Sequence, residues 1–510
     1  MMQEYYQIGG FHPHIDWPEC RSYDDKKLAQ LIAGHASPLR SREVDSIELV
    51  LGIKRTGTTH LLLTGRQLHE LVRAHRRPYP RRPPAESTDF ESLSPIYFRN
   101  ADEFADMLGV LKIKSVKKRA ATDNSQANKQ FVSGDDGIQR GGFEHGRLFY
   151  GILHNRIELG KYSLNDASWT RSVRVFSFVF TPRSHDTRPS EDRRKHPVAL
   201  DCAISEATVP ELLLRGGSSF HLYFTNNRFM NASSKRVGFK HGTTEELDGM
   251  VISARLKDFF SERMTSTEPI ILLVHDEELS KNMLTNCGID ISSWETGIRG
   301  LLGFQTTKVH NSRNDYHRQG DHRRDSHSYY HDRRTRPRSR SRSPPRTYGR
   351  QALPRSRTQS YGRSPPRAYS GTSGTSAEPP RGAHAPVYVV DIKQQFMKLM
   401  QTATSSENVT EISKYLGLSS AEGWCAGNES VMIIDIWRSM ISGPPIDEQR
   451  ALRESGLDVQ SAADPAAQAG PSLEYDSDQD PNSIQQETRQ VAHNPDSDSD
   501  YGQSSDSDSD

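Results

Sequence analysis

The pattern of hydrophobic and polar residues in the first part of the chain predicts short strands and one well-marked helix. Ser46–Arg55 and Ser172–Phe180 have the pattern of strands, as does the short apolar run Leu148–Leu153. Thr64–His75 has apolar residues at helical spacing behind a threonine that can cap the helix. We therefore predict an N-terminal segment, 1–39, followed by an α+β region, 40–182, which we assign to no known fold.

A different pattern follows a polar, proline-containing stretch, residues 183–195, which we predict to be a linker. Strands are predicted at VALDCAI (198–204), ELLLRGG (211–217), FHLYFTNNRF (220–229), PIILLVH (269–275) and VYVVD (387–391). Helices are predicted at 250–263, 276–288, 392–402, 408–416 and 426–440. Together they predict an α/β domain, one mixed sheet flanked by helices, built from residues 196–304 and 387–442.

Composition and charge remove two long segments from this folded part. The chain is 34% hydrophobic with a mean hydropathy of −0.75, and its formal net charge is only +1. That near-neutrality hides a strong asymmetry. Asn311–Ser370 holds 16 Arg against 4 Asp, whereas 443–510 holds 16 acidic residues against 3 Arg. We predict a disordered Arg/Ser- and Pro-rich insert at 305–386 and a disordered acidic tail at 443–510.

Several classes of site are disfavoured by the residues themselves. The four cysteines lie far apart without a CxxC pair, and the longest aliphatic run is too short to cross a membrane. His12, His14 and Cys20 lack a second ligand pair at a suitable spacing, so we read them as an ordinary polar segment. The basic cluster Lys112–Arg119 is open to two interpretations, a nuclear-import signal or the solvated end of an element.

The second folded region resembles the ribonuclease H-like fold of the DEDD exonucleases. The resemblance rests on the predicted order β-β-β-α-β-α-β-α and on four segments: VALDCAI with Glu211 after it, FHLYFTNNRFM with Phe239-Lys-His-Gly after it, LVHDEELSKNMLTNCGIDI, and AGNESVMIIDIWRSM. It is closest to the C-terminal domain of the fungal good-for-full-DEAD-box-activity proteins, which are associated with mRNA export. Such nucleases use two divalent ions held by four carboxylates.

Most of the catalytic positions that this resemblance implies are changed. The family's Asp-x-Glu becomes Asp201-Cys202-Ala203, and the Asp expected five residues after His275 becomes Ser280. The third motif, His-x-x-Gly-Asn-Asp, becomes Trp424 to Glu429, with Trp424 in place of the general base and Glu429 in place of the last Asp. We therefore expect a degenerate nuclease fold with no catalytic residues and no cofactor.

Two alternatives to this interpretation stay open. One is a weakly active 3′-5′ exonuclease that rebuilds a Mg²⁺ or Mn²⁺ site from Asp201, Asp276 and Glu429. The other is a protein-interaction scaffold in which the insert is only a linker. Our first hypothesis is a non-catalytic protein that binds RNA or single-stranded nucleic acid, in RNA processing or mRNA export.

The insert supplies the predicted nucleic-acid contacts, because arginine binds phosphate with two donors and stacks on bases. The candidate contact residues are Arg333, Arg334, Arg336, Arg338, Arg340, Arg342 and Arg346. Candidate phosphorylation sites for Ser/Arg-directed kinases are Ser339, Ser341, Ser343 and Ser364. A DEAD-box helicase is the partner that the resemblance implies, no membrane partner is expected, and the expected compartment is the nucleus, the cytoplasm or both.

Overall fold

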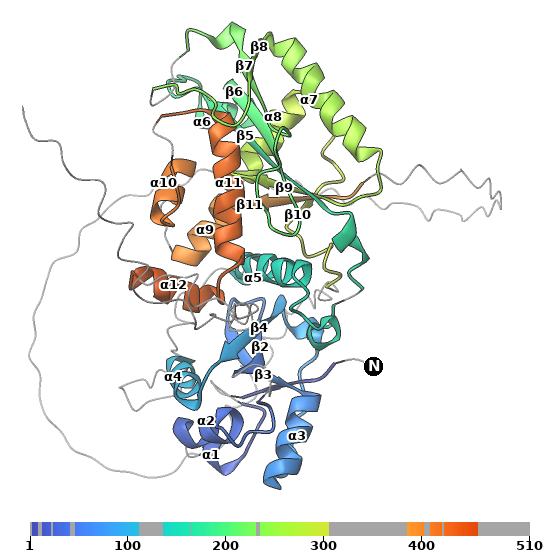
Figure 1. Cartoon of the computed structure of the whole chain (residues 1–510), viewed down its shortest axis with the longest axis vertical. Helices are drawn as coiled ribbons and strands as arrows, with labels where there is room; N and C mark the ends of the chain where they lie inside the picture. Colours follow the sequence, from blue (N-terminus) through green and yellow to red (C-terminus); the bar gives the residue numbers. More distant parts are fainter. Residues whose placement is uncertain are drawn as a thin grey trace, which may run out of the picture.

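The computed structural model describes residues 3–8, 13–21, 24–40, 46–111, 136–164, 166–230, 235–304, 385–401, 408–420 and 423–456. The candidate arginines and serines of the insert, the basic cluster 112–119, His12 and the acidic tail beyond residue 456 lie outside these residues. Two sheets and the helices around them form the described part, with the smaller sheet at one end of the long axis (Figure 1).

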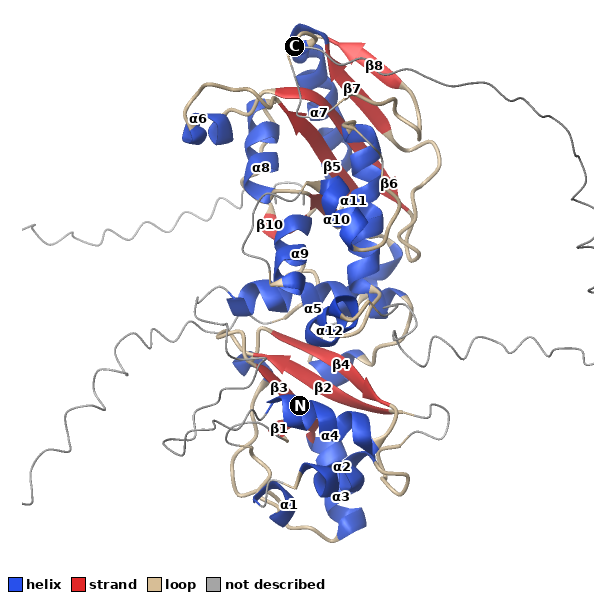
Figure 2. Cartoon of the chain, turned by 90° about the vertical axis from the view of Figure 1, so that its left-hand side faces the viewer, coloured by secondary structure: helices blue, strands red, loops and turns tan. Residues whose placement is uncertain are grey.

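The smaller sheet has four antiparallel strands in the order β1-β3-β2-β4 (Figure 2). Its strands are β1 (Tyr5–Gln7), β2 (Ile47–Ile53), β3 (Thr59–Thr64) and β4 (Ser92–Phe98). The helices at this end are α1 (Pro18–Arg21), α2 (Asp25–Ala33), α3 (Gly65–His75) and α4 (Ala101–Leu111). One face of the sheet packs with α2, α3 and α4 through residues such as Leu49 and Leu63.

The larger sheet has seven strands in the order β10-β11-β9-β5-β6-β7-β8. The strands are β5 (Arg174–Pro182), β6 (Ala199–Ala207), β7 (Phe220–Phe224), β8 (Thr244–Leu247), β9 (Ile270–Val274), β10 (Glu295–Thr296) and β11 (Val387–Asp391). Strand β6 is antiparallel to both of its neighbours, and the other neighbouring pairs are parallel. The protein is therefore α/β with a mixed, mostly parallel sheet.

Helices cover both faces of this sheet. They are α6 (Ser190–Lys195), α7 (Gly249–Met264), α8 (Glu277–Asn286), α9 (Ile392–Met400), α10 (Val409–Tyr415) and α11 (Ala426–Ile441). Helices α7 and α8 pack on the face that carries Phe178 and Leu272, whereas α9, α10 and α11 pack on the face that carries Val179 and Leu273. Burial on both faces explains why β9 reads as a continuous apolar run in the sequence.

Helix α5 (Asp136–Leu153) lies between the two sheets and belongs to the core of both (Figure 1). Two of its glycines let neighbouring elements pack closely against the helix. A Cβ atom at Gly141 would lie 3.1 Å from the Glu91 side chain, and one at Gly146 would lie 2.6 Å from Ile441 of α11. Side chains at these places would hold the neighbours apart, so the glycines offset their helix-propensity cost of about 1 kcal/mol each by allowing close packing.

Helix α12 (Ile446–Glu454) adds a polar connection to the junction. Asp447 pairs with Arg140 of α5, and Thr59 donates to the same Asp447 oxygen at 3.1 Å. Arg140 is 1% exposed and also donates to the Thr59 hydroxyl at 2.9 Å. These contacts join the small sheet, α5 and α12 through one buried guanidinium.

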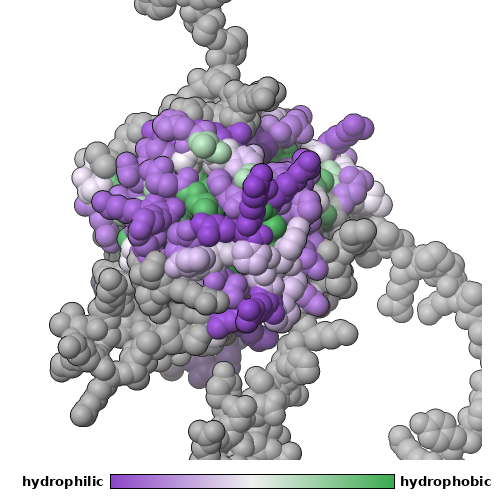
Figure 3. Space-filling model, turned by 90° about the horizontal axis from the view of Figure 1, so that it is seen from below, coloured by the Kyte–Doolittle hydropathy of each residue, from purple (hydrophilic) through white to green (hydrophobic). Residues whose placement is uncertain are grey.

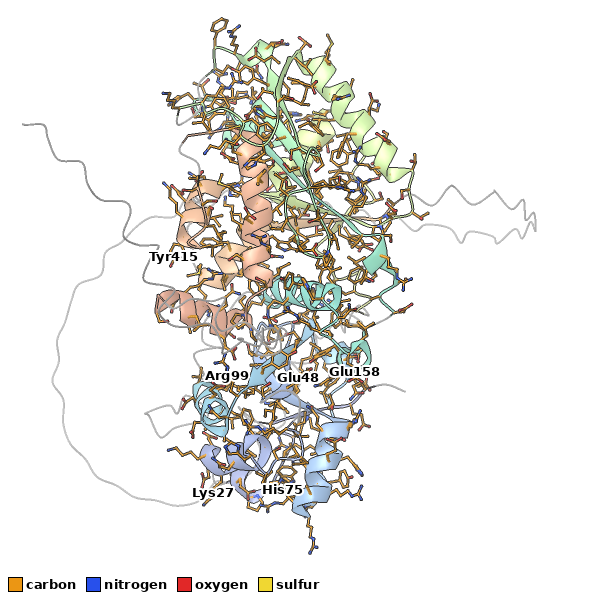
Figure 4. All side chains as sticks on the ribbon, viewed as in Figure 1. Lys27, Glu48, His75, Arg99, Glu158 and Tyr415 are labelled. Carbon is orange, nitrogen blue, oxygen red and sulfur yellow. The ribbon has the colours of Figure 1, made fainter. Side chains whose placement is uncertain are left out.

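A second connection runs from the small sheet to the segment that leads into β5. Glu48 on β2, labelled in Figure 4, lies 2.8 Å from the Lys161 ammonium group and accepts a hydrogen bond from the Tyr162 hydroxyl. Burial, with Glu48 nearby, raises the pKa of Tyr162 well above its usual range, so the phenol stays a neutral donor. The two sheets are therefore joined by apolar packing and by side-chain hydrogen bonds.

Several predicted elements are confirmed, including the Thr64 cap of α3, and four predictions are wrong. Residues 148–153 are helical because they complete α5, and 211–217 are not a strand because Leu212 adopts a left-handed φ of 53° after Pro210. The linker expected at 183–195 joins neighbouring strands of one sheet and contains α6. The tail predicted to be disordered from 443 begins with α12.

No helix within the described ranges is both long and apolar enough to cross a membrane. Viewed from below, the described surface of the small-sheet end is mainly hydrophilic, with small, separate hydrophobic spots (Figure 3). The large apolar side chains at this end lie instead in the core, as Trp17 does at 0% exposure.

The shared core predicts that both sheets unfold together. Trp437 of α11 is fully buried, with its ring 5.5 Å from that of Phe149 on α5. We expect Trp437→Ala to cost about 3–5 kcal/mol of unfolding free energy and to lower a single urea transition followed by circular dichroism. Val251→Ala, at a half-exposed position of α7, should change it by less than about 0.5 kcal/mol. Two separate transitions would contradict a shared core.

Candidate functional site

A fully buried carboxylate on β6 is the centre of the candidate site. Asp201 is 0% exposed, and its Oδ2 atom accepts hydrogen bonds from His221 Nε2 at 2.6 Å and from the Ala426 backbone N–H at 3.0 Å. Ala426 is the first residue of α11, and its N-cap residue, Cys425, makes no side-chain cap. Asp201 thus supplies the acceptor and the negative charge that this helix end needs.

His221 and Cys425 complete a cluster around the same point. His221 lies on β7, where its Nε2 atom is 3.9 Å from Cys425 Sγ, and its Nδ1 atom is 2.9 Å from the Thr244 hydroxyl of β8. Burial lowers the pKa of His221, but the Asp201 hydrogen bond and the nearby Cys425 outweigh it and raise the pKa to about 9. At neutral pH this imidazole is therefore charged and paired with Asp201.

The cluster is closed by the segment 235–240, which we name the cover. The Asn428 side chain holds it, donating to Gly238 O at 2.9 Å and accepting from the Lys240 N–H at 2.9 Å. Phe239 of the cover lies against Gly427, where a Cβ atom would be 2.5 Å from its ring, and 5.5 Å from the His221 ring. The Gly-Asn pair of the third motif therefore has a structural role here.

Trp424 also holds the cover in place. Its backbone N–H donates to Lys235 O at 2.9 Å, and its side chain is buried with Leu200 and Tyr223. On the outside, the Arg236 guanidinium stacks on the Tyr223 ring at 3.7 Å. The residue at the general-base position therefore packs in an apolar cluster and fixes the cover.

Glu429, on the first turn of α11, is kept from ionising. Burial and the charge of Asp201 raise the pKa of Glu429 to about 8. The Glu429 carboxyl is therefore mostly protonated near neutral pH when no ion is bound. Asp201 and Glu429 do lie in one neighbourhood, as the motif positions imply, but only one of them carries charge.

Asp276 lies in a different group of acids, at the ends of β9 and β11. It caps α8 by accepting from the Leu279 N–H at 3.0 Å, and Lys393 Nζ is 3.9 Å from its carboxylate. Asp391 accepts from the N–H groups of Glu277 and Gln394, both at 2.8 Å, and so caps α8 and α9 together. Burial raises the pKa of Asp391 to about 7 against these two hydrogen bonds.

The ligand set expected for an active enzyme is not assembled. In the described part of the chain, the one group of three His, Cys, Asp or Glu ligands within 4.8 Å of one another is Asp201, His221 and Cys425, without Asp276 or Glu429. Ala203 is buried on the α11 face next to Asp201, whereas Ser280 is on α8, which covers the other face. The sequence indicated Asp201 but not His221, Cys425 or the cover. These residues meet only in the folded chain, where β7 pairs with β6 and α11 begins beside them.

The raised pKa of Glu429 gives a pH-dependent prediction. The unfolded chain releases this proton near the ordinary value of 4.5, but the folded chain holds it until about 8. Wild-type protein should therefore lose stability relative to Glu429→Gln as pH rises from about 5 to about 8, with a constant difference above that. Each unit of pKa difference corresponds to about 1.4 kcal/mol, so we expect the stability difference between the two proteins to change by several kcal/mol between pH 5 and pH 8.

The control for this prediction is Glu262→Gln, because the Glu262 side chain is 82% exposed and should show no such trend. Thermal unfolding at pH 5, 6, 7 and 8 measures both variants. A Glu429→Gln difference that does not change with pH would contradict a protonated Glu429.

Comparison with known proteins adds no family to this site. No protein-family model matches the chain, and no curated protein matches it. The site itself contains a buried carboxylate, an imidazole and a thiol that converge, with a neutral carboxylic acid beside them.

Proposed function

We propose that this protein is a non-catalytic RNA-binding protein built on a degenerate ribonuclease H-like fold of the DEDD exonuclease type. The strand order supports the fold. Counted from β5, and with the short elements α6, β8 and β10 left aside, the elements β5, β6, β7, α7, β9, α8, β11 and α9 follow the order β-β-β-α-β-α-β-α on which the resemblance rests. In space, β5, β6 and β7 form an antiparallel unit, and the parallel strands β9 and β11 are added on the other side of β5.

If β5 is the first strand of the family's fold, the first catalytic motif should lie on β5 and not on β6. The family's Asp-x-Glu lies on the first strand, and β5 reads RVFSFVFTP, without any carboxylate. In this counting Asp201 lies on the second strand, β6, and not on the first strand, where the sequence alone placed the first motif. The non-catalytic assignment rests on this observation. The central strand, β5, supplies no metal ligand. The nearby Asp201 is already hydrogen-bonded to His221 and to the first N–H of α11.

The surface around the cover has the chemistry of a nucleic-acid contact. Residues 225–243 contain four Lys or Arg and no Asp or Glu. Within the described part of this stretch, Arg228, Lys235 and Lys240 are exposed, and Phe229 is 95% exposed. Cations that follow a phosphate backbone, together with an aromatic ring on which a base can stack, are the elements of single-strand binding.

The Arg-rich insert supports the same function from outside the described residues. It leaves the folded domain after residue 304 and returns at residue 385, so it is tethered to the larger sheet at both ends. A tethered polycation raises the local concentration of RNA near the cover. We propose Ser/Arg-directed kinases as its regulators, a DEAD-box helicase as the partner, and the nucleus or cytoplasm as the place of action.

The assignment predicts that the protein does not cleave RNA. A labelled single-stranded oligoribonucleotide incubated with the full chain and Mg²⁺ or Mn²⁺ should stay intact over hours on a denaturing gel. Wild-type protein is the decisive sample, because we expect Asp201 variants to lose stability as well. Metal-dependent cleavage that persists in repurified protein and is lost in Glu429→Gln would contradict the assignment.

Binding should depend on the insert and on salt. We expect replacement of residues 305–384 by a Gly/Ser linker of equal length to weaken binding of oligo(U) RNA at least tenfold in about 50 mM salt, measured by fluorescence anisotropy. The slope of log affinity against log salt should also become shallower, by about 0.7 for each lost phosphate contact. As a control, residues 471–510 are replaced by a Gly/Ser linker of their own length. This replacement should not weaken binding. Unchanged affinity without the arginines would refute the role of the insert.

A further inference from the structure

Three side chains of different chemistry converge beneath the cover. The carboxylate of Asp201, the imidazole of His221 and the thiol of Cys425 each bring one ligand atom within 4.8 Å of the others. They come from β6, β7 and the residue before α11, and their exposed fractions are 0%, 1% and 1%. The Oδ1 atom of Asp201 is buried with no hydrogen-bond partner. A buried carboxylate oxygen without a donor is costly unless something else compensates it.

We propose that Asp201, His221 and Cys425 bind one zinc-class divalent ion. Thiolate sulfur, imidazole nitrogen and carboxylate oxygen are the ligands that zinc uses, whereas Mg²⁺ and Ca²⁺ take oxygen alone. A thiolate and a carboxylate also balance the two charges of the ion. The bound cluster is then neutral, as a site with almost no solvent access requires.

Small shifts bring the three atoms to the spacing of a tetrahedral site. Zinc–ligand distances of about 2.0–2.3 Å place N and O about 3.4 Å apart and N and S about 3.6 Å apart. His221 Nε2 is now 2.6 Å from Asp201 Oδ2 and 3.9 Å from Cys425 Sγ. The ion therefore replaces the proton between His221 and Asp201, with movements of about 0.8 Å and about 0.3 Å.

The surroundings hold the ligands in place for this role. The Thr244 hydroxyl accepts a hydrogen bond from the Nδ1–H of His221, 2.9 Å away, and so directs Nε2 toward the cluster. The Ala426 N–H orients the Asp201 carboxylate in the same way. Such contacts behind the ligands are typical of metal sites, where they fix the ring and the carboxylate. Asp201 Oδ1, which has no hydrogen-bond partner, can approach the ion as a second, longer contact of the same carboxylate.

The proposed ion has a structural role, and its binding depends neither on RNA binding nor on cleavage. An ion here would join β6, β7 and the start of α11, beneath a cover that Phe239 and Trp424 seal. It differs from a two-metal nuclease site in its ligands, since it uses one carboxylate with a thiol and an imidazole. Removal of the ion should loosen the cover.

Cobalt spectroscopy of the full chain is the direct test. The insert carries six histidines (His310, His317, His322, His327, His331 and His384) that can also bind metals, so total metal content alone does not identify the site. A cobalt ion bound to a thiolate absorbs in the near ultraviolet by charge transfer, which histidine ligands do not produce. We expect this band to saturate at one equivalent of Co²⁺ and to disappear when one equivalent of Zn²⁺ is added.

Cys425→Ser should abolish the charge-transfer band and weaken zinc affinity at least tenfold in competition with a chromophoric chelator. Cys287→Ser, at another buried cysteine, is the matched control and should keep both. Circular dichroism checks that both variants fold. His221→Gln gives a second reading, since it should lose affinity while keeping the thiol. Absence of the band in wild-type protein, or an equal band in Cys425→Ser, would overturn the proposal.

Discussion

The need to compensate one buried carboxylate organises the larger domain. Asp201 has no access to water, so its charge must be met by groups of the protein. His221 supplies a proton-carrying nitrogen from the neighbouring strand, and Ala426 supplies the first N–H of α11. These two contacts fix the position of α11 on the sheet, and α11 in turn carries the residues that hold the cover. Removing either partner would leave a buried charge unpaired, at a cost of several kcal/mol.

Helix α11 passes this constraint on to the rest of the molecule. Its far end packs against α5, where Gly146 lets Ile441 approach closely, and α5 packs against the small sheet on its other side. The small sheet is therefore joined to the large one through two helices with few side chains between their backbones. The buried acids of the larger domain are thus used to hold its architecture together. Lys235 and Lys240 of the cover are exposed and are the cations that we propose for a nucleic-acid contact.

Local signals were sufficient for some of the regular elements. The capping threonine of α3, the apolar run of β9 and the strand VYVVD all lie where the pattern predicts them. Residues 148–153 of α5 resemble a strand because five glycines interrupt the helical pattern. The close approaches at Gly137, Gly141 and Gly146 are tertiary contacts. Helix α12 had a usable signal, a proline before two acids, but the acidic composition of the tail obscured it. The site needed pairing information: His221 is 20 residues from Asp201, and Cys425 is 204 residues beyond His221.

A double-mutant cycle between Asp201 and His221 tests most directly whether this buried pair holds the domain together. Unfolding free energies are measured in chelator-treated buffer for wild type, Asp201→Asn, His221→Gln and the double variant. We expect each single variant to lose about 3–5 kcal/mol and the pair to be coupled by about 1–3 kcal/mol in the stabilising direction. A coupling energy near zero, with additive losses, would contradict the role given to Asp201.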